Sequence, residues 1–340
     1  MNRAEDMFKT IEYTNEKLVV LDQTLLPAAV VYETLDTVES VFDAIQKLKV
    51  RGAPLIGVAA AYGVLVGVRE YKESPTILEE VAKVCSYLNA ARPTAVNLSW
   101  ALNRMQLAAL AARNSAPLYE SLVAEAQKIH AEDLEINRRI GEQTYELVKD
   151  KIKDNAITIM THCNAGALAT TGYGTATSVM YALRDKGVKV KVFASETRPL
   201  LQGARLTAWE LMEAGIEVTL ITDNMAATVL ASGVVDFVIV GADRVAANLD
   251  VANKVGTLGV SIIAERYGVP FYVACPSPSF DVSTACGKDI VIEEREGSEI
   301  TSIRGVALAP DGVATFNPAF DITPHDSITA VVTEEGVLRR

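Results

Sequence analysis

In the second half of the chain, short apolar runs rich in β-branched residues alternate with segments of helix length. The runs span 156–160, 188–194, 216–221, 234–240 and 269–274. A strand that is buried on both faces is apolar at nearly every position, and a helix between two such strands returns the chain to the same end of the sheet. The pattern therefore predicts a doubly wound parallel sheet of the Rossmann-like type.

The first half of the chain has a different pattern. Short strands are expected at 18–22 and 29–33, followed by helices at 38–48, 54–70, 76–90, one that ends near 113, and a long one at 117–151. The helix at 54–70 is apolar nearly all round, which indicates burial, and the long helix carries an apolar stripe suited to bridging two domains. We predict an N-terminal mainly helical domain with a small β-sheet (1–150) and a C-terminal Rossmann-like domain (151–340). The latter becomes loop-rich from 297, and its ordered part is expected to end near 324.

Cys163 stands where the first strand of the predicted parallel sheet ends. Gly166, Gly172 and Gly174 follow it, ahead of a helix expected from about Thr175. Glycines let a backbone approach an anion closely, and a helix N-terminus favours phosphate and thiolate. The loop therefore predicts a phosphate site beside a reactive thiol, although free cysteine is also a common space-filling residue. The glycine spacing fits no nucleotide-binding fingerprint.

Asp243 follows the apolar run 234–240 and so lies at the same edge of the sheet, where ligands of open α/β sheets bind. Burial there would raise the pKa of its carboxyl and suit it to general-acid catalysis. A loop-capping role for Asp243 is equally open from the pattern alone. His162 adjoins Cys163 on a strand, and adjacent strand residues face opposite ways, so we interpret His162 as a supporting or structural residue.

The formal net charge is −11, from 32 Lys and Arg against 43 Asp and Glu. Such a protein repels nucleic acid and anionic membranes, so we expect neither as a partner. An anionic ligand would need a few cations inside a cleft, which suits a small phosphorylated metabolite. Arg51 beside Gly52 at the start of a buried helix is one candidate, and Lys254 after Asn253 is another. Either side chain could instead face solvent.

Four cysteines, Cys85, Cys163, Cys275 and Cys286, are scattered without a C-x-x-C pair or paired histidines. That spacing argues against a zinc site and against a disulfide framework. The first residues contain no apolar signal core, and no apolar run is expected to approach the twenty residues of a membrane span. We expect a cytoplasmic protein.

Six motifs, in order from about residue 17 to 324, resemble the methylthioribose-1-phosphate isomerase family. They are Arg51-Gly-Ala-Pro, Arg92-Pro-Thr-Ala-Val-Asn-Leu-Ser-Trp, Thr161-His-Cys-Asn-Ala-Gly, Glu196-Thr-Arg-Pro-Leu-Leu-Gln-Gly-Ala-Arg, Gly241-Ala-Asp-Arg and Asn253-Lys. The same superfamily includes ribose-1,5-bisphosphate isomerases, deoxyribose-phosphate relatives and regulatory subunits of a translation-initiation nucleotide exchange factor. The motifs are specific for the superfamily and less so for the substrate.

The resemblance implies a homodimeric enzyme without metal or nucleotide cofactor. Its implied catalytic pair is Cys163 and Asp243, and the residues implied around the phosphosugar are Arg51, Gly52, Ala53, Arg92, Gln202, Asn253 and Lys254. The implied reaction is the aldose–ketose isomerisation of 5-methylthioribose 1-phosphate to 5-methylthioribulose 1-phosphate in methionine salvage. The alternatives are a related isomerase of 5-deoxyribose 1-phosphate or ribose 1,5-bisphosphate, and a non-catalytic regulatory subunit of the same fold.

These residue types suit that chemistry. Because the anomeric oxygen of an aldose 1-phosphate is esterified, an acid must protonate the ring oxygen as the ring opens, and a neutral Asp243 is the candidate. Cys163 as a thiolate could take the proton from C2 and return it to C1. A direct hydride shift from C2 to C1, with Cys163 stabilising charge, is the rival mechanism, and the sequence favours neither.

Overall fold

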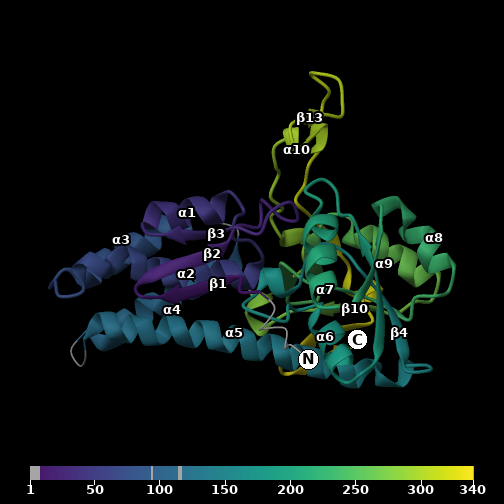
Figure 1. Cartoon of the computed structure of the whole chain (residues 1–340), viewed down its shortest axis with the longest axis horizontal. Helices are drawn as coiled ribbons and strands as arrows, with labels where there is room; N and C mark the ends of the chain where they lie inside the picture. The colour runs from purple at the N-terminus through teal and green to yellow at the C-terminus, as the bar shows by residue number, and fades with distance from the viewer. Residues whose placement is uncertain (1–7, 93–94, 114–116, 340) are drawn as a thin grey trace.

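The computed structural model describes residues 8–92, 95–113 and 117–339, which form a helical half and a half built on a large sheet (Figure 1). Pro93 and Thr94, in the motif that begins at Arg92, lie outside the described residues. The helical half joins a three-stranded antiparallel sheet to a group of helices. Its elements are β1 Ile11–Thr14, β2 Lys17–Leu21, β3 Tyr32–Leu35, α1 Val38–Gln46, α2 Ala53–Val68, α3 Ile77–Asn89 and α4 Val96–Ala112. The sequence did not predict β1, whose mixed polar and apolar residues make a weak strand signal, and it placed the third strand three residues too early.

Helix α2 forms the centre of the helical half because its 16 residues carry no charge and nearly all are buried. By length and composition alone, one helix among the described residues, Ala53–Tyr71, could cross a membrane, and 72% of its most apolar stretch is buried inside the fold. The expectation that no apolar run approaches the length of a membrane span is therefore wrong for this segment. Its composition reflects packing on all sides, as predicted for the helix at 54–70.

Helix α5, Leu118–Val148, runs along both halves (Figure 1). Leu122 and Ile129 pack into the hydrophobic core of the helical half, whereas Ile140 and Val148 pack into the core of the sheet half. The long helix therefore connects two separate cores, as its apolar stripe predicts. The domain boundary at 150/151 stays a prediction.

The sheet half centres on a seven-stranded sheet in the order β16-β15-β10-β7-β4-β5-β6. Its strands are β4 Ala156–Thr161, β5 Lys189–Ser195, β6 Glu217–Ile221, β7 Phe237–Val240, β10 Phe271–Ala274, β15 Ala330–Thr333 and β16 Gly336–Arg339. All five predicted strands are present, and all strands but β16 run parallel. When the six parallel strands are numbered along the chain from β4 to β15, their order across the sheet is 3-2-1-4-5-6. This is the Rossmann arrangement. The expectation that ordered structure ends near residue 324 is wrong, since β15 and β16 complete the sheet.

Helices cover both faces of this sheet. Helix α5 packs on one face with α6 Ser178–Asp185 and α7 Ala208–Glu213, whereas α8 Ala226–Ala231 and α9 Thr257–Arg266 pack on the other. Alternate residues of β7 enter the two cores: Ile239 lies in the first and Val240 in the second. Burial on both faces explains why strands such as β7 and β10 form continuous apolar runs that the sequence could predict.

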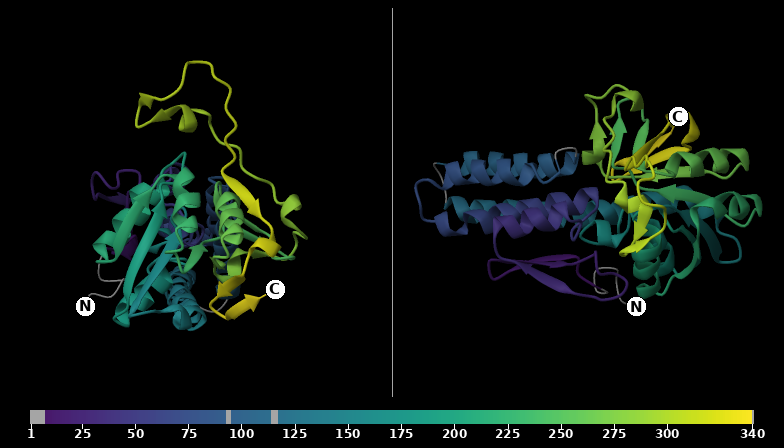
Figure 2. Two further views of the ribbon diagram at one scale, coloured as in Figure 1. Left: turned by 90° about the vertical axis from the view of Figure 1, so that its right-hand side faces the viewer. Right: turned by 90° about the horizontal axis from the view of Figure 1, so that it is seen from above.

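The chain leaves the large sheet after β7 to start a smaller sheet, and it leaves again after β10 to complete that sheet and to form a projecting arm. The small sheet has the order β11-β8-β9-β14, with β8 Arg244–Ala246, β9 Val251–Lys254, β11 Phe280–Asp281 and β14 Phe320–Thr323. The arm carries α10 Ser298–Thr301, β12 Ser302–Ile303 and β13 Val306–Ala307, and it projects from the body in Figure 1 and in the left view of Figure 2. The stretch expected to be a loop-rich tail is thus an excursion, and the chain returns from it to both sheets.

Candidate active site

All nine residues predicted for the site border one cavity of about 410 Å³, a volume suited to a small metabolite. The helical half contributes Arg51, Gly52, Ala53 and Arg92, and the sheet half contributes Cys163, Gln202, Asp243, Asn253 and Lys254. Cys163 and Asp243 follow β4 and β7, which are neighbours in the sheet. The strand order reverses between these two strands, and ligands of open α/β sheets bind at that switch point.

Cys163 has a strained backbone that is held from both sides. Its φ of 65° lies in the left-handed region that favours glycine. Its N–H donates to Thr197 Oγ1 at 2.9 Å, and Thr207 Oγ1 donates to its carbonyl oxygen at 2.6 Å. Strain of this kind is often stored at functional sites, and a purely space-filling cysteine would not need it.

Burial raises the pKa of the Cys163 thiol, while the charges of Lys254 and Arg51 oppose that rise. The free protein therefore favours the thiol over the thiolate. The sequence had predicted a thiolate stabilised by a helix N-terminus. The groups that favour the thiolate are instead two cations from separate elements and the backbone N–H of Asn164.

Asp243 is fixed at the start of the small sheet, where its backbone N–H donates to Ala252 O at 2.9 Å. Burial raises the pKa of its carboxyl, with Lys254 and Arg92 as the main opposing charges. The raised pKa favours the neutral acid, in the direction that the sequence predicts. Within the described residues its side chain caps no backbone N–H, so the loop-capping interpretation finds no support.

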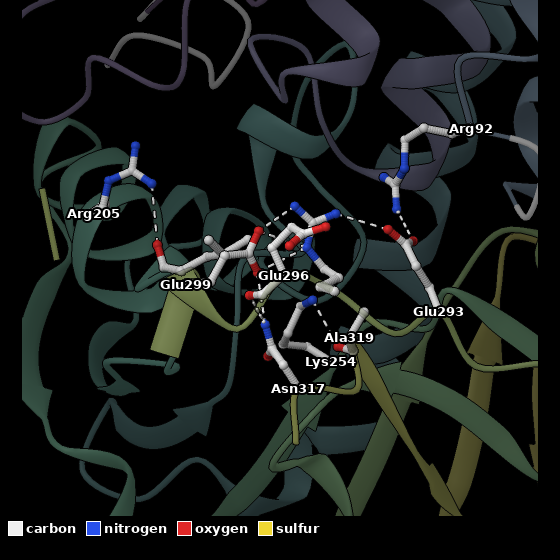
Figure 3. Close-up of polar contacts among 10 residues, drawn as sticks. Arg92, Arg205, Lys254, Glu293, Glu296, Glu299, Asn317 and Ala319 are labelled. Carbon is white, nitrogen blue, oxygen red and sulfur yellow. Dashed lines mark hydrogen bonds and ion pairs between the residues drawn. The ribbon is translucent and has the colours of Figure 1, made fainter. Parts of the chain in front are cut away.

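The predicted cations Arg51 and Lys254 border the cavity rather than the outer surface. Lys254 is 9% exposed, and its Nζ donates to Ala319 O at 2.8 Å (Figure 3). Burial lowers the pKa of both cationic groups, while Cys163 and Asp243 raise it. The two cations, the thiol and the carboxyl therefore lie close enough to affect one another's charge.

Gly52 brings the start of α2 to the cavity wall. Its φ is 96°, and a Cβ at this position would lie 2.5 Å from Ala169. Only glycine therefore allows this approach. Ala53 and Pro54 open the helix at the cavity, and the unpaired N–H groups of a helix start attract anions.

The other predicted ligand-binding residues offer polar groups of different kinds. Gln202 Oε1 is buried and has no hydrogen-bond partner in the part of the chain that the structure describes, so it can accept a bond from a ligand hydroxyl. Asn253 Nδ2 donates to Thr257 Oγ1 at 3.0 Å. Arg92 donates to a carboxylate oxygen of Glu293 at 2.9 Å (Figure 3).

The glycine loop after Cys163 wraps an anion of the protein itself. The carboxylate of Glu210, on α7, is fully buried and accepts hydrogen bonds from the backbone N–H groups of Ala167 at 3.2 Å and Leu168 at 3.0 Å. A Cβ on Gly166 would collide with Glu210 Oε1. The prediction that this loop binds a phosphate is therefore wrong for these two amides, which already bind a carboxylate.

His162 makes a supporting contact and also borders the cavity, so its supporting role stays a prediction. Its Nε2 donates to Val255 O at 2.9 Å, and the ring is 2% exposed. Burial lowers the pKa of the imidazole, so the ring is neutral. The contact ties the end of β4 to the turn that follows Lys254. Among residues 8–92, 95–113 and 117–339, no group of three or more His, Cys, Asp and Glu is arranged to hold a metal ion.

The sequence missed several cavity residues that act through partners far along the chain. Glu293, on the segment leading into the arm, accepts from Arg92 (Figure 3). It also accepts from Arg295 at 2.8 Å. Asn164 stands inside a motif that the sequence singled out, yet its partner Glu210 is 46 residues away. Charged residues on loops and short helices are usually solvated, so no local signal marked them.

Comparison with known proteins shows which family this chain belongs to. The sequence model of the Initiation factor 2 subunit family matches residues 49–340. The chain belongs to this family. A 5-deoxyribose 1-phosphate isomerase of Bacillus thuringiensis serovar kurstaki is 54% identical over 341 residues, covering 98% of this chain and 96% of the relative.

Two solved structures share the fold along nearly the whole chain. The 5-methylthioribose 1-phosphate isomerase of Pyrococcus horikoshii OT3 is 41% identical with a TM-score of 0.89, and the match covers 97% of this chain and 92% of that one. The translation initiation factor eIF-2B subunit delta of A. fulgidus is 43% identical with a TM-score of 0.87, covering 98% and 96%. The predicted fold class is confirmed.

Proposed function

We propose that the protein is an aldose–ketose isomerase of pentose 1-phosphates and that its preferred substrate is 5-deoxyribose 1-phosphate. The observation that carries the proposal is the convergence of a thiol, a carboxyl with a raised pKa and several cations on one cavity at the switch point. The name of the Bacillus thuringiensis relative supports the choice of substrate. This choice was an alternative in the sequence analysis, and the relatives favour it over the main expectation, 5-methylthioribose 1-phosphate.

The phosphate of the substrate binds at the start of α2. Arg51 supplies a charged, forked donor there, and the first amides of the helix at Gly52 and Ala53 supply neutral ones. Arg92 and Lys254 add positive charge from the other walls. In a protein of net charge −11, these local cations offset the repulsion that an anionic substrate meets.

Asp243 and Cys163 then act on opposite sides of the sugar. Cys163 must first lose its proton, and the charges of Lys254 and Arg51 favour that ionisation against the effect of burial. The thiolate then removes the proton from C2, and the C2–H electron pair forms the C1–C2 double bond as the bond from C1 to the ring oxygen breaks. Asp243 protonates that oxygen, which leaves an enol phosphate. The thiol returns its proton to C1, and the carboxylate of Asp243 takes the proton of the C2 hydroxyl, which gives the ketose and restores both groups.

A hydride shift from C2 to C1 remains the rival mechanism, and solvent deuterium separates the two. An S–H proton that exchanges with solvent before it returns to C1 leaves solvent deuterium there, so the reaction run in D2O and followed by NMR is expected to place deuterium at C1 of the ketose. Complete retention of the substrate hydrogen would support the hydride shift or a base shielded from exchange.

A substrate comparison tests the proposed specificity. The purified protein is assayed with 5-deoxyribose 1-phosphate, 5-methylthioribose 1-phosphate and ribose 1,5-bisphosphate. We expect the highest kcat/KM with the first. A higher value with the methylthio sugar would restore the main expectation of the sequence analysis, which the Pyrococcus horikoshii structure supports.

A second class of function is the non-catalytic regulatory subunit, which the name of the A. fulgidus structure favours. A protein of that class has no need to keep the thiol, the acid and the cations together. Absence of turnover with all three sugar phosphates would favour the regulatory class.

We also propose a homodimer that associates through the sheet half. Large apolar side chains are exposed there, among them Met212, Leu220 and Met225. Apolar surface of this kind is often covered by a partner. Sedimentation equilibrium at micromolar concentration is expected to give twice the chain mass, and a species of 36.5 kDa would contradict the dimer.

A further inference from the structure

Glu210 is a buried carboxylate that the proposed reaction does not use. Its Oε2 accepts hydrogen bonds from Asn164 Nδ2 at 3.1 Å and from the backbone N–H of Leu168 at 3.0 Å, while Oε1 accepts from the N–H of Ala167 at 3.2 Å. A buried charge is costly unless it is well partnered, and here three donors point at two oxygens. In all three contacts a carboxyl oxygen is the acceptor.

The carboxylate determines which way the side-chain amide of Asn164 points. The oxygen and nitrogen of an Asn amide are nearly equal in shape, so the surrounding donors and acceptors decide its orientation. Thr207 Oγ1 donates to Cys163 O at 2.6 Å and so offers Asn164 Nδ2 only a lone pair, at 3.1 Å. Glu210 and Thr207 therefore both hold the NH2 group on their side, and Oδ1 faces the opposite way.

Asn164 Oδ1 faces Arg51. The guanidinium NH1 donates to this oxygen, and NH2 donates to the backbone oxygen of the same residue at 2.7 Å. A forked contact of this kind fixes the plane of the guanidinium. With the amide reversed, Asn164 would present its NH2 group to the Arg51 guanidinium, and one of the two hydrogen bonds between these residues would be lost.

We propose that Glu210 is a positioning residue which, through the amide of Asn164, orients the guanidinium of Arg51 toward the phosphate of the substrate. The inference rests on the proposed function, because Arg51 is there the phosphate ligand. It also explains the glycine loop, since Gly166 leaves room for the carboxylate and the loop amides fix it in place before substrate arrives. Such preorganisation lowers the cost of binding.

Exchanging the charge between the two residues tests the proposal. Glu210→Gln replaces one acceptor by a donor, and Asn164→Asp places two carboxylates side by side. The double variant Asn164→Asp/Glu210→Gln keeps the net charge, lets the new amide at position 210 donate to the new carboxylate at position 164, and still presents an oxygen to Arg51. Glu213→Gln, an exposed position on the same helix, is the matched control.

The measurements are the affinity for inorganic phosphate by calorimetry, kcat and KM with 5-deoxyribose 1-phosphate, and the thermal unfolding midpoint. For Glu210→Gln we expect about a tenfold loss of phosphate affinity and a similar rise in KM, the size of one charged hydrogen bond, with kcat within about threefold. The double variant is expected to recover most of both values, and Glu213→Gln to match the wild type. If Glu210 served only stability, Glu210→Gln would lower the thermal unfolding midpoint, and the double variant would not restore phosphate affinity and KM.

Wild-type phosphate affinity in Glu210→Gln would overturn the proposal. If that variant unfolds at a lower temperature, the double variant decides, because a recovered midpoint without recovered phosphate affinity also overturns it. Arg51→Ala separates this failure from failure of the proposed function. If Arg51→Ala keeps wild-type phosphate affinity, the phosphate site itself is wrong, whereas weak binding by Arg51→Ala with normal binding by Glu210→Gln rejects only the positioning role.

Discussion

The two halves of the molecule supply the cavity in different ways. In the sheet half, Cys163 and Asp243 lie in the loops that follow β4 and β7, and hydrogen bonds within that half fix the backbone of both residues. In the helical half, Arg51 and Arg92 reach the cavity from loops, and each is held by a residue of the sheet half. The difference teaches that the sheet half alone places the reacting groups and Lys254, whereas the two phosphate-binding arginines depend on contacts between the halves. Changes on the two sides should therefore alter different kinetic constants.

The largest effect is expected at the strand ends. Cys163→Ser and Asp243→Asn should each lower kcat by at least about a hundredfold, the usual contribution of general acid–base catalysis, with KM little changed. Their combined loss should be smaller than the product of the single losses, because both groups act in one step. Steady-state kinetics measures both, with Cys286→Ser, a cysteine that does not border the cavity, as the control. Near-normal kcat in Cys163→Ser would remove the thiol from the mechanism.

The cations should show the opposite signature. Arg51→Ala and Lys254→Ala are expected to raise KM by about tenfold or more and to change kcat less, because a phosphate contact binds substrate and transition state alike. The same assay measures this, with the exposed Arg266→Ala as control. Unchanged KM in both variants would mean that neither side chain contacts the phosphate.

A smaller effect is expected on the pH dependence of stability, through the buried carboxyl of Glu210. Burial raises the pKa of Glu210 to about 7 from an ordinary value of 4.5. The folded state thus binds more protons than the unfolded state between these values, so the contribution of Glu210 to stability falls as pH rises through them, by about 1.4 kcal/mol per unit. Urea unfolding from pH 4 to 8 should show Glu210→Gln gaining stability relative to wild type as pH rises. A difference between the two proteins that does not vary with pH would contradict the raised pKa.

The smallest effect on activity is expected far from the cavity in the helical half. Thr37 caps α1, accepting from the N–H of Ser40 at 3.1 Å while the Ser40 hydroxyl accepts from the N–H of Thr37. Thr37→Ala should cost about 1 kcal/mol of unfolding free energy, the usual value of a cap. Denaturant titration measures the loss, and kcat and KM should equal the wild-type values. A change in either constant would show that the helical half affects the cavity beyond its two arginines.

The sequence could predict the large sheet because its central strands β7 and β10 are buried on both faces and therefore apolar throughout, and the strands beside them keep enough apolar residues to be recognised. It could also place Cys163 and Asp243 at one edge, because parallel strands bring their carboxyl ends together. The same reasoning missed β15 although its apolar run was present, since the loops before it were taken for the end of ordered structure. It missed β1 because a short, half-exposed strand carries little signal.

The partners of the site were beyond such reasoning. Glu210 lies on a short helix whose sequence looks amphipathic, and its burial is decided by a glycine loop more than forty residues earlier. Glu293 meets Arg92 across 201 positions of the chain. Periodicity reports which face of an element is buried, and it contains nothing about which distant polar groups will meet. The upward shift of the Cys163 pKa likewise depends on burial, which no local sequence pattern reveals.

The central claim is that Arg51 and the start of α2 bind the phosphate while Cys163 and Asp243 act on the sugar. A crystal structure of Cys163→Ser with 5-deoxyribose 1-phosphate bound tests this claim most directly, because the variant should bind substrate without turning it over. We predict that the phosphate lies at the start of α2, with oxygens within hydrogen-bond distance of the Arg51 guanidinium and of the amides at Gly52 and Ala53. We also predict that C2 faces residue 163 and the ring oxygen faces Asp243. A phosphate bound away from Arg51, or a sugar whose C2 and ring oxygen face neither residue, would contradict the account.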